Sequence, residues 1–149
     1  MAKKPIELKH QQRPPKEGAF IAYKKVIGSY VREGRVDRDY CVLTLLVPAS
    51  AQRVKRREGN EMHKMRVSGV KVLAARRVHY PPDTIETVLK ASRRQTFASG
   101  YDPNFAYKVG ETAYAKGWDG KRHFDPRNVI CSEGIHCFAT EDEAKEYDL

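Results

Sequence analysis

The residues with the greatest chemical potential gather near the end of the chain. Cys131, His136 and Cys137 lie within seven positions of one another, and thiolates and imidazoles are preferred zinc ligands. The spacing does not complete a site, because a second well-spaced pair is missing and adjacent residues of a strand point to opposite faces. His63 and His123 could in principle supply further ligands. We predict no metal and interpret both cysteines as small buried residues.

A strand and a helix must position these residues. The strand opens at Gly134, and alternation divides its residues between two faces: Ile135, Cys137 and Ala139 on one, His136 and Phe138 on the other. Thr140 and Glu143 have the spacing of a capping box, which predicts a helix from Glu141 to about Tyr147. The predicted helix carries acidic residues in its first turn, where they favour the positive end of the helix dipole.

His136 also suggests a ligand pocket. An imidazole can contact a phosphate or a base, and aromatic residues elsewhere in the last third could complete its surroundings. The candidate lining residues are Tyr101, Tyr107, Trp118, His136 and Phe138. The alternative is a hydrogen-bonded core histidine, which is the more common state of a lone histidine on a strand. Replacement of His136 by alanine separates loss of folding from loss of binding.

Length and hydropathy patterning predict a single α+β domain, mainly antiparallel sheet with a short C-terminal helix. The 149 residues, of which 40% are hydrophobic, are enough to bury a core without disulfide or metal staples. We expect a flexible basic N-terminal arm over residues 1–17, where Pro14 and Pro15 disfavour a helix, and the domain over 18–149. Alternation and β-branched runs predict strands at 19–28, 40–47, 64–78 with a bulge near Gly69, and 105–109. Residues 84–91 fit either a helix or a strand, and Cys41 fits the core.

Positive charge is concentrated in the middle of the chain. The net charge is +9, and residues 50–100 contain 12 Lys/Arg against 4 Asp/Glu. A localised positive field favours nucleic acid or another anionic partner, whereas the bland interpretation is a solvated surface. The predicted anion-binding residues are Arg53, Lys55, Arg56, Arg57, Arg76, Arg77, Arg93 and Arg94. No apolar run approaches the roughly 20 residues that cross a bilayer, so we expect a cytoplasmic protein whose three cysteines are thiols and which does not bind membranes.

The order of several short phrases resembles an uncharacterised domain family of bacteriophages and large DNA viruses, which is also found attached to pentapeptide-repeat proteins. The matching segments are Leu45–Ala51 (near L-x-I-P-x-x-A), Lys64–Val67 (near K-C-R-A), Tyr101–Gly110 (near Y-D-x-x-F-x-Y-x-V-G) and Cys131–Phe138 with Ala144 and Tyr147 (near C-x-x-G-I-H-F-F…A-x-x-Y). The sequence departs from this pattern at Met65, where the family often has cysteine, and at Cys137, where it often has an aromatic residue. The missing cysteine weakens a metal site further.

The segment from Gly134 to Tyr147 is also similar to the G-I-Y-F-A…A-x-x-Y segment of ADP-ribosyltransferases, where a strand and the following helix line the NAD pocket. That family further needs a histidine- or arginine-bearing strand upstream and a catalytic glutamate downstream, and neither is convincingly present. We therefore predict a noncatalytic, phage- or virus-type binding protein without a cofactor. Its expected partner is nucleic acid or an acidic host protein. The alternative is a nucleotide-binding or ADP-ribosyltransferase-like protein centred on the Gly134–Phe138 motif.

Overall fold

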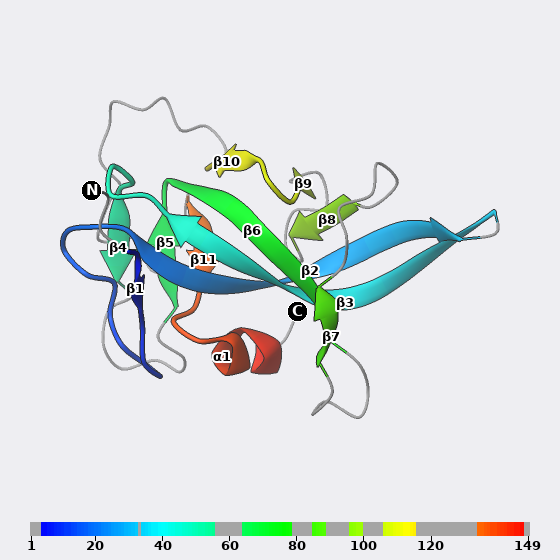
Figure 1. Cartoon of the computed structure of the whole chain (residues 1–149), viewed down its shortest axis with the longest axis horizontal. Coiled ribbons are helices and arrows are strands. Elements are labelled where there is room, and N and C mark those ends of the chain that lie inside the picture. The colour runs from blue at the N-terminus through cyan, green and yellow to red at the C-terminus, as the bar shows by residue number, and fades with distance from the viewer. Residues whose placement is uncertain are drawn as a thin grey trace.

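A long antiparallel hairpin is the spine of the fold. A computed structural model describes residues 4–32, 34–55, 64–78, 85–88, 96–99, 106–115 and 134–147. Strands β2 (Phe20–Arg32) and β3 (Arg35–Val47) pair along their full length, and the hairpin projects well beyond the neighbouring strands (Figure 1). Gly34 has a φ of +78°, a conformation that favours glycine and suits the tight turn between the paired Arg32 and Arg35.

The remaining strands extend this hairpin into a large sheet with a smaller one beside it. The large sheet has the strand order β10-β6-β3-β2-β8-β9. Besides the hairpin, it contains β6 (Gly69–Val78), β8 (Thr96–Ser99), β9 (Ala106–Tyr107) and β10 (Thr112–Tyr114). Two further strands pair beside this path, β1 (Ile6–Glu7) with β2 and β7 (Ile85–Val88) with β6. The small sheet has the order β11-β5-β4 and comprises β4 (Arg53–Lys55), β5 (Met65–Val67) and β11 (Ile135–Cys137). All of these pairs are antiparallel except that of β1 with β2.

The large sheet curls around its core. Its two outermost strands are β9 and β10, and only residues 108–111 separate them in the chain. Five Cα steps reach at most about 18 Å, so the two edges of the sheet must lie close together. The main apolar cluster fills the inside of this curl and includes Phe20, Leu43, Val72, Phe97 and Tyr107.

The other side of the sheet carries the helix. Helix α1 (Glu141–Glu146) begins at the N-cap Thr140, and it lies along β2 and β3 below the sheet in the view of Figure 1. Ala144 is fully buried there and packs with Val42 and Phe138 in a second cluster, against which Tyr147 also lies. The predicted architecture of a mainly antiparallel sheet with a short C-terminal helix is thus confirmed, as is the cap at Thr140.

Two predicted elements differ from the structure. The strand expected over 64–78 is divided at Ser68 into β5 and β6, which belong to different sheets. The division occurs because Ser68 bonds elsewhere: its N–H donates to the Gln52 carbonyl at 3.0 Å, and its carbonyl accepts from the Ala115 N–H at 2.8 Å. The bulge lies at Leu73 rather than near Gly69. Thr44 of β3 pairs with Ala74 and Leu45 pairs with Val72, so the register shifts at Leu73. The segment left open between helix and strand contains β7.

The N-terminal arm contacts the domain at several of its described residues, 4–17, although most of them are exposed. Strand β1 pairs with the start of β2, and Leu8 is buried with the main core. The Glu143 carboxylate oxygen Oε1 accepts from the Gln11 N–H at 2.9 Å and lies 3.1 Å from His10 Nδ1. The arm, expected to be flexible, is therefore attached at both the sheet and the helix.

Candidate functional site

Three segments divide the outer edge of β2 between them. Its first two residues pair with β1, residues 26–29 pair with β8, and Tyr23, which lies between them, bridges to Phe138. The Tyr23 N–H donates to the Phe138 carbonyl at 2.9 Å, and the Phe138 N–H donates back at 2.8 Å. This bridge fixes the Gly134–Phe138 motif against the central hairpin.

Within the motif, His136 and Cys137 face opposite sides, as strand geometry predicts. Cys137 is fully buried in the main core, whereas His136 is half-buried and pairs across the sheet with Arg66. Burial raises the pKa of the Cys137 thiol to about 12, and the nearby Lys24 opposes this only partly. A protonated, enclosed thiol is a poor nucleophile and a poor metal ligand. Among the described residues, no three His, Cys, Asp or Glu side chains are grouped to hold a metal ion, and Cys131 lies outside that part of the chain.

Lys24 is a buried charged residue that the sequence analysis did not single out. Its side chain is 8% exposed, and Nζ donates to the His136 carbonyl at 3.0 Å. Burial lowers the pKa of Lys24 to about 8, Cys137 acts in the opposite direction, and Lys64 lowers it further. The signal was present in the sequence, since Lys24 continues the alternation of Phe20 and Ala22 toward the core.

The predicted aromatic pocket is not assembled from its described members. Tyr107 is buried inside the curled sheet, opposite Phe97 on the neighbouring strand. Phe138 lies in the helix-side cluster, with its ring centroid 5.1 Å from that of Tyr147. The structure therefore places Tyr107 and Phe138 in different clusters. Tyr101 and Trp118 lie outside the described residues.

Arg53, a predicted anion-binding residue, is instead bound to backbone carbonyls. Its Nη1 donates to Gly18 at 2.6 Å and Pro15 at 3.2 Å, and its Nη2 donates to Pro48 at 2.9 Å and Ala49 at 3.3 Å. Nε donates to Ala51 at 3.3 Å, and the guanidinium lies 5.0 Å from the centroid of the Phe20 ring. Burial lowers the pKa of Arg53. The side chain holds the arm against the turn that precedes β4.

The other predicted anion-binding residues fall into two groups. Arg76 and Arg77 lie on β6, where Arg76 Nη1 is 3.8 Å from Glu141 and Arg77 Nε is 3.5 Å from Asp39. The backbone of Lys55 ends β4. Arg56, Arg57, Arg93 and Arg94 lie outside the described residues.

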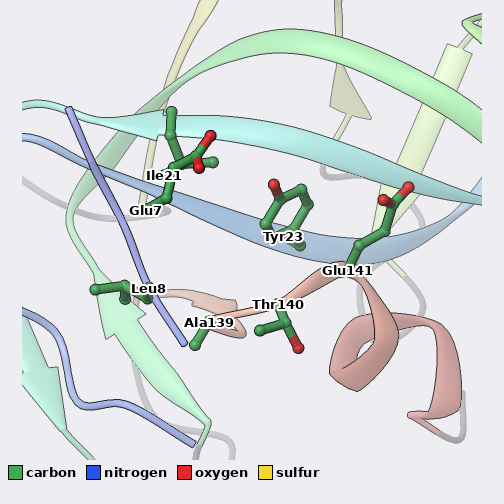
Figure 2. A pocket seen from close by; sticks show the side chains of 7 residues that line it. All are labelled: Glu7, Leu8, Ile21, Tyr23, Ala139, Thr140 and Glu141. Atoms are coloured by element: carbon green, nitrogen blue, oxygen red, sulfur yellow. The ribbon is translucent and has the colours of Figure 1, made fainter. Parts of the chain in front are cut away.

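A hollow that the sequence analysis missed lies beside the C-terminal motif (Figure 2). It measures about 150 Å³ and is formed where β1, β2 and the start of α1 meet. Its lining residues are Glu7, Leu8, Ile21, Tyr23, Ala139, Thr140 and Glu141. Burial raises the pKa of Tyr23, Glu141 and Glu7 raise it further, and Arg76 lowers it. The hollow is thus acidic although the protein as a whole is basic.

The fold and these sites define an α+β protein in which a curled antiparallel sheet holds its N-terminal arm by buried polar contacts. The chain belongs to a family of unknown function, DUF5758, whose sequence model matches residues 10–144. No curated protein and no solved structure matches the chain. Within the part of the chain that the structure describes, no helix is long and apolar enough to span a membrane.

Proposed function

We propose that the protein is a noncatalytic binding protein of phage or viral type that acts in the cytoplasm of a host cell. It engages an anionic partner, nucleic acid or an acidic host protein, through a basic surface. We use the name basic edge for the exposed arm cations Lys9, Arg13 and Lys16 together with the run Lys55–Arg57, of which Arg56 and Arg57 follow β4 in the sequence and lie outside the described residues. The observation that carries the proposal is the contact of Arg53 with the arm.

Arg53 brings two basic segments together that are far apart in the sequence. Its guanidinium bonds the carbonyls of Pro15 and Gly18, which flank the exposed Lys16. Arg53 also begins β4, and Lys55 follows it by two strand positions, or about 7 Å. The backbone of Lys55, where the 55–57 run begins, therefore lies near residues 15–18 of the arm, and we propose that the cations of both segments contribute to one local field.

The two arginines of β6 have a smaller part in this proposal. Arg76 is 45% exposed but lies near Glu141, and Arg77 is 20% exposed and lies near Asp39. A carboxylate beside each guanidinium reduces its attraction for a further anion. Arg53 acts by positioning, because its donors already serve five carbonyls.

The nucleotide-binding alternative has no comparable support. The hollow beside the Gly134–Phe138 motif presents the carboxylates of Glu7 and Glu141, which repel phosphates.

Binding of a fluorescent oligonucleotide across a salt series tests the proposal. If the partner is a nucleic acid backbone, log K falls linearly with log salt, with a slope of about −0.9 for each phosphate neutralised on duplex DNA. Replacing Arg56 and Arg57 by glutamine should make the slope less negative by up to about 1.8. A second variant with Arg13 and Lys16 replaced by glutamine tests the arm.

The matched control replaces Lys71 and Lys108, two exposed lysines outside the basic edge, by glutamine. Equal losses in control and test variants would show diffuse attraction and overturn the assignment to the basic edge. Absence of binding to single- and double-stranded oligonucleotides, together with salt-dependent binding to an acidic peptide, would move the partner to a protein surface. A flat response to salt with both probes would refute an anionic partner.

A further inference from the structure

The hollow between the arm and helix α1 has the volume of a small-molecule site. Its volume of about 150 Å³ is similar to that of engineered protein cavities that hold benzene. Leu8, Ile21 and Ala139 provide an apolar lining, and the Tyr23 ring lies between Glu7 and Glu141 (Figure 2). The hollow therefore combines space for a small planar group with two carboxylates at its border.

Polar groups of this hollow have unused bonding capacity. Neither the Glu7 carboxylate nor the Tyr23 hydroxyl has a hydrogen-bond partner among the residues that the structure describes. Glu141 has Arg76 nearby, but their closest approach is 3.8 Å, beyond the 2.7–3.2 Å of an N–H···O hydrogen bond. A ligand that donates several hydrogen bonds could satisfy both carboxylates.

We propose that this hollow binds a guanidinium group on a short alkyl stem. A guanidinium is planar, presents five N–H donors in a fixed geometry and stacks on aromatic rings. In the proposed arrangement, the guanidinium donates to Glu7 and Glu141, its face lies on Tyr23 and its stem lies on Leu8 and Ile21. A primary ammonium has the charge but cannot stack, so it binds more weakly.

A divalent metal ion fits the hollow less well. Calcium takes 6–8 oxygen ligands, whereas the lining offers two carboxylates and the hydroxyls of Tyr23 and Thr140 beside apolar side chains. The same apolar residues are favourable to an alkyl stem.

Binding here would also fasten the arm. Glu7 belongs to β1, whereas Glu141 belongs to α1, so one guanidinium that contacts both would bridge the two segments. This site is independent of the basic edge, and it selects a cation where the basic edge selects an anion.

Titration of the isotope-labelled protein with ethylguanidinium, followed by backbone amide NMR, tests the site. We expect saturable shifts concentrated at residues 7, 21, 23 and 139–141 and a dissociation constant of about 1 mM, with weaker binding of ethylammonium. Glu7→Gln should weaken ethylguanidinium binding about twofold to fivefold, as should Glu141→Gln, because both carboxylates are partly or fully exposed. Arg76→Gln should strengthen binding about twofold to fivefold, because it removes the competing cation.

Glu111→Gln is the matched control, since Glu111 is an exposed glutamate in the turn after β9. Absence of saturable shifts in the wild-type protein would overturn the proposal. Equal affinity of Glu7→Gln and the wild-type protein would also overturn it, and because Glu7 is exposed, this variant should keep the fold. Tyr23→Phe, which keeps the ring, should retain most of the binding if stacking dominates, and a complete loss would contradict the stacked arrangement.

Two sources of the guanidinium are distinguished by a second titration. An acetylated and amidated Gly-Arg-Gly peptide is compared with the same peptide carrying neutral citrulline. Tighter binding of the arginine peptide than of ethylguanidinium identifies the arginine of a protein partner, whereas binding of ethylguanidinium alone identifies a free small guanidine. Equal binding of the citrulline and arginine peptides would refute recognition of the charge.

Discussion

Lys24 and Glu143 are both buried, but they differ in the number of polar partners that compensate their charges. Their exposed fractions are 8% and 4%. Glu143 Oε1 receives the Gln11 N–H and the Thr140 hydroxyl and lies near His10, whereas Lys24 Nζ donates to one carbonyl. Glu143 Oε2 is buried without a hydrogen-bond partner among the described residues, but the two hydrogen bonds to Oε1 compensate this carboxylate better than one carbonyl compensates Lys24. Burying a charge is costly unless partners compensate it, so we expect Lys24 to lower the stability of the fold more than Glu143 does. Burial alone therefore does not show whether a charge supports a structure.

The largest expected effect is the loss of stability in Glu143→Ala. This substitution leaves the Gln11 N–H and the Thr140 hydroxyl without their acceptor and detaches the arm from the helix. We expect a decrease of about 3 kcal/mol in the free energy of unfolding, measured by denaturant titration. Hydrogen exchange at the Gln11 amide should accelerate beyond the change in global stability.

Glu146→Ala is the control for this effect, because Glu146 is an exposed glutamate of the same helix. A loss of stability no larger than that of Glu146→Ala would contradict the structural role of Glu143. Glu143→Gln separates charge from hydrogen bonding, because the amide keeps an acceptor oxygen. We expect it to lose less stability than the alanine variant.

Lys24→Met should raise the stability of the protein, whereas Glu143→Ala lowers it. Methionine has a similar length and no charge, so the variant should be more stable than the wild-type protein at pH 7 by about 1–2 kcal/mol. The advantage should decrease at alkaline pH. The folded-state pKa of Lys24 is about 8, below its ordinary 10.5, so the folded protein binds fewer protons than the unfolded chain between these values.

The contribution of Lys24 to stability consequently rises from pH 8 to about 10.5. Burial of the Cys137 thiol has the opposite sign, because a pKa raised to about 12 makes the fold less stable once unfolded thiols ionise near pH 9. Denaturant titrations of the wild-type protein and Lys24→Met at pH 7 and pH 10 give the difference in stability at each pH. The contribution of Cys137 is present in both proteins and cancels in that difference. An equal difference at the two pH values would refute the shifted pKa of Lys24.

Local patterns predicted the long strands and the helix, but they did not predict short strands such as β4, β8 and β10, and contacts between distant segments were not visible in the sequence. The spacing of Thr140 and Glu143 correctly gave the helix start, because a cap depends on residues three apart. Strand β1 could not be predicted, since two residues show no period and its pairing depends on tertiary contacts. The break at Ser68 was missed for the same reason, as its partners Gln52 and Ala115 come from other parts of the chain.

The site residues show the same limit. The sequence predicted Arg53 only as one of several anion-binding cations. Its carbonyl partners come from the arm and from the turn before β4, and these two segments meet only in the folded protein. Likewise, Tyr107 and Phe138 are both aromatic residues of the last third of the chain, but they lie in separate clusters. Tyr107 packs in the main core, and Phe138 packs in the cluster beside helix α1. By contrast, the burial of Lys24 has a local signal, because Phe20, Ala22 and Lys24 are two positions apart and therefore share one face of the strand.

The smallest expected effect concerns Thr140, which links the helix cap to the Glu143 carboxylate. The Thr140 hydroxyl oxygen accepts the Glu143 N–H at 3.3 Å and lies 3.0 Å from Glu143 Oε1. Thr140→Ala should cost about 1 kcal/mol, and Thr140→Ser, which keeps the hydroxyl, should cost much less. Because both residues belong to one network, the double variant Thr140→Ala/Glu143→Ala should lose about 1 kcal/mol less than the sum of the single variants. Denaturant titration of the four proteins measures this coupling, and strict additivity would mean that the cap and the buried carboxylate stabilise the helix independently.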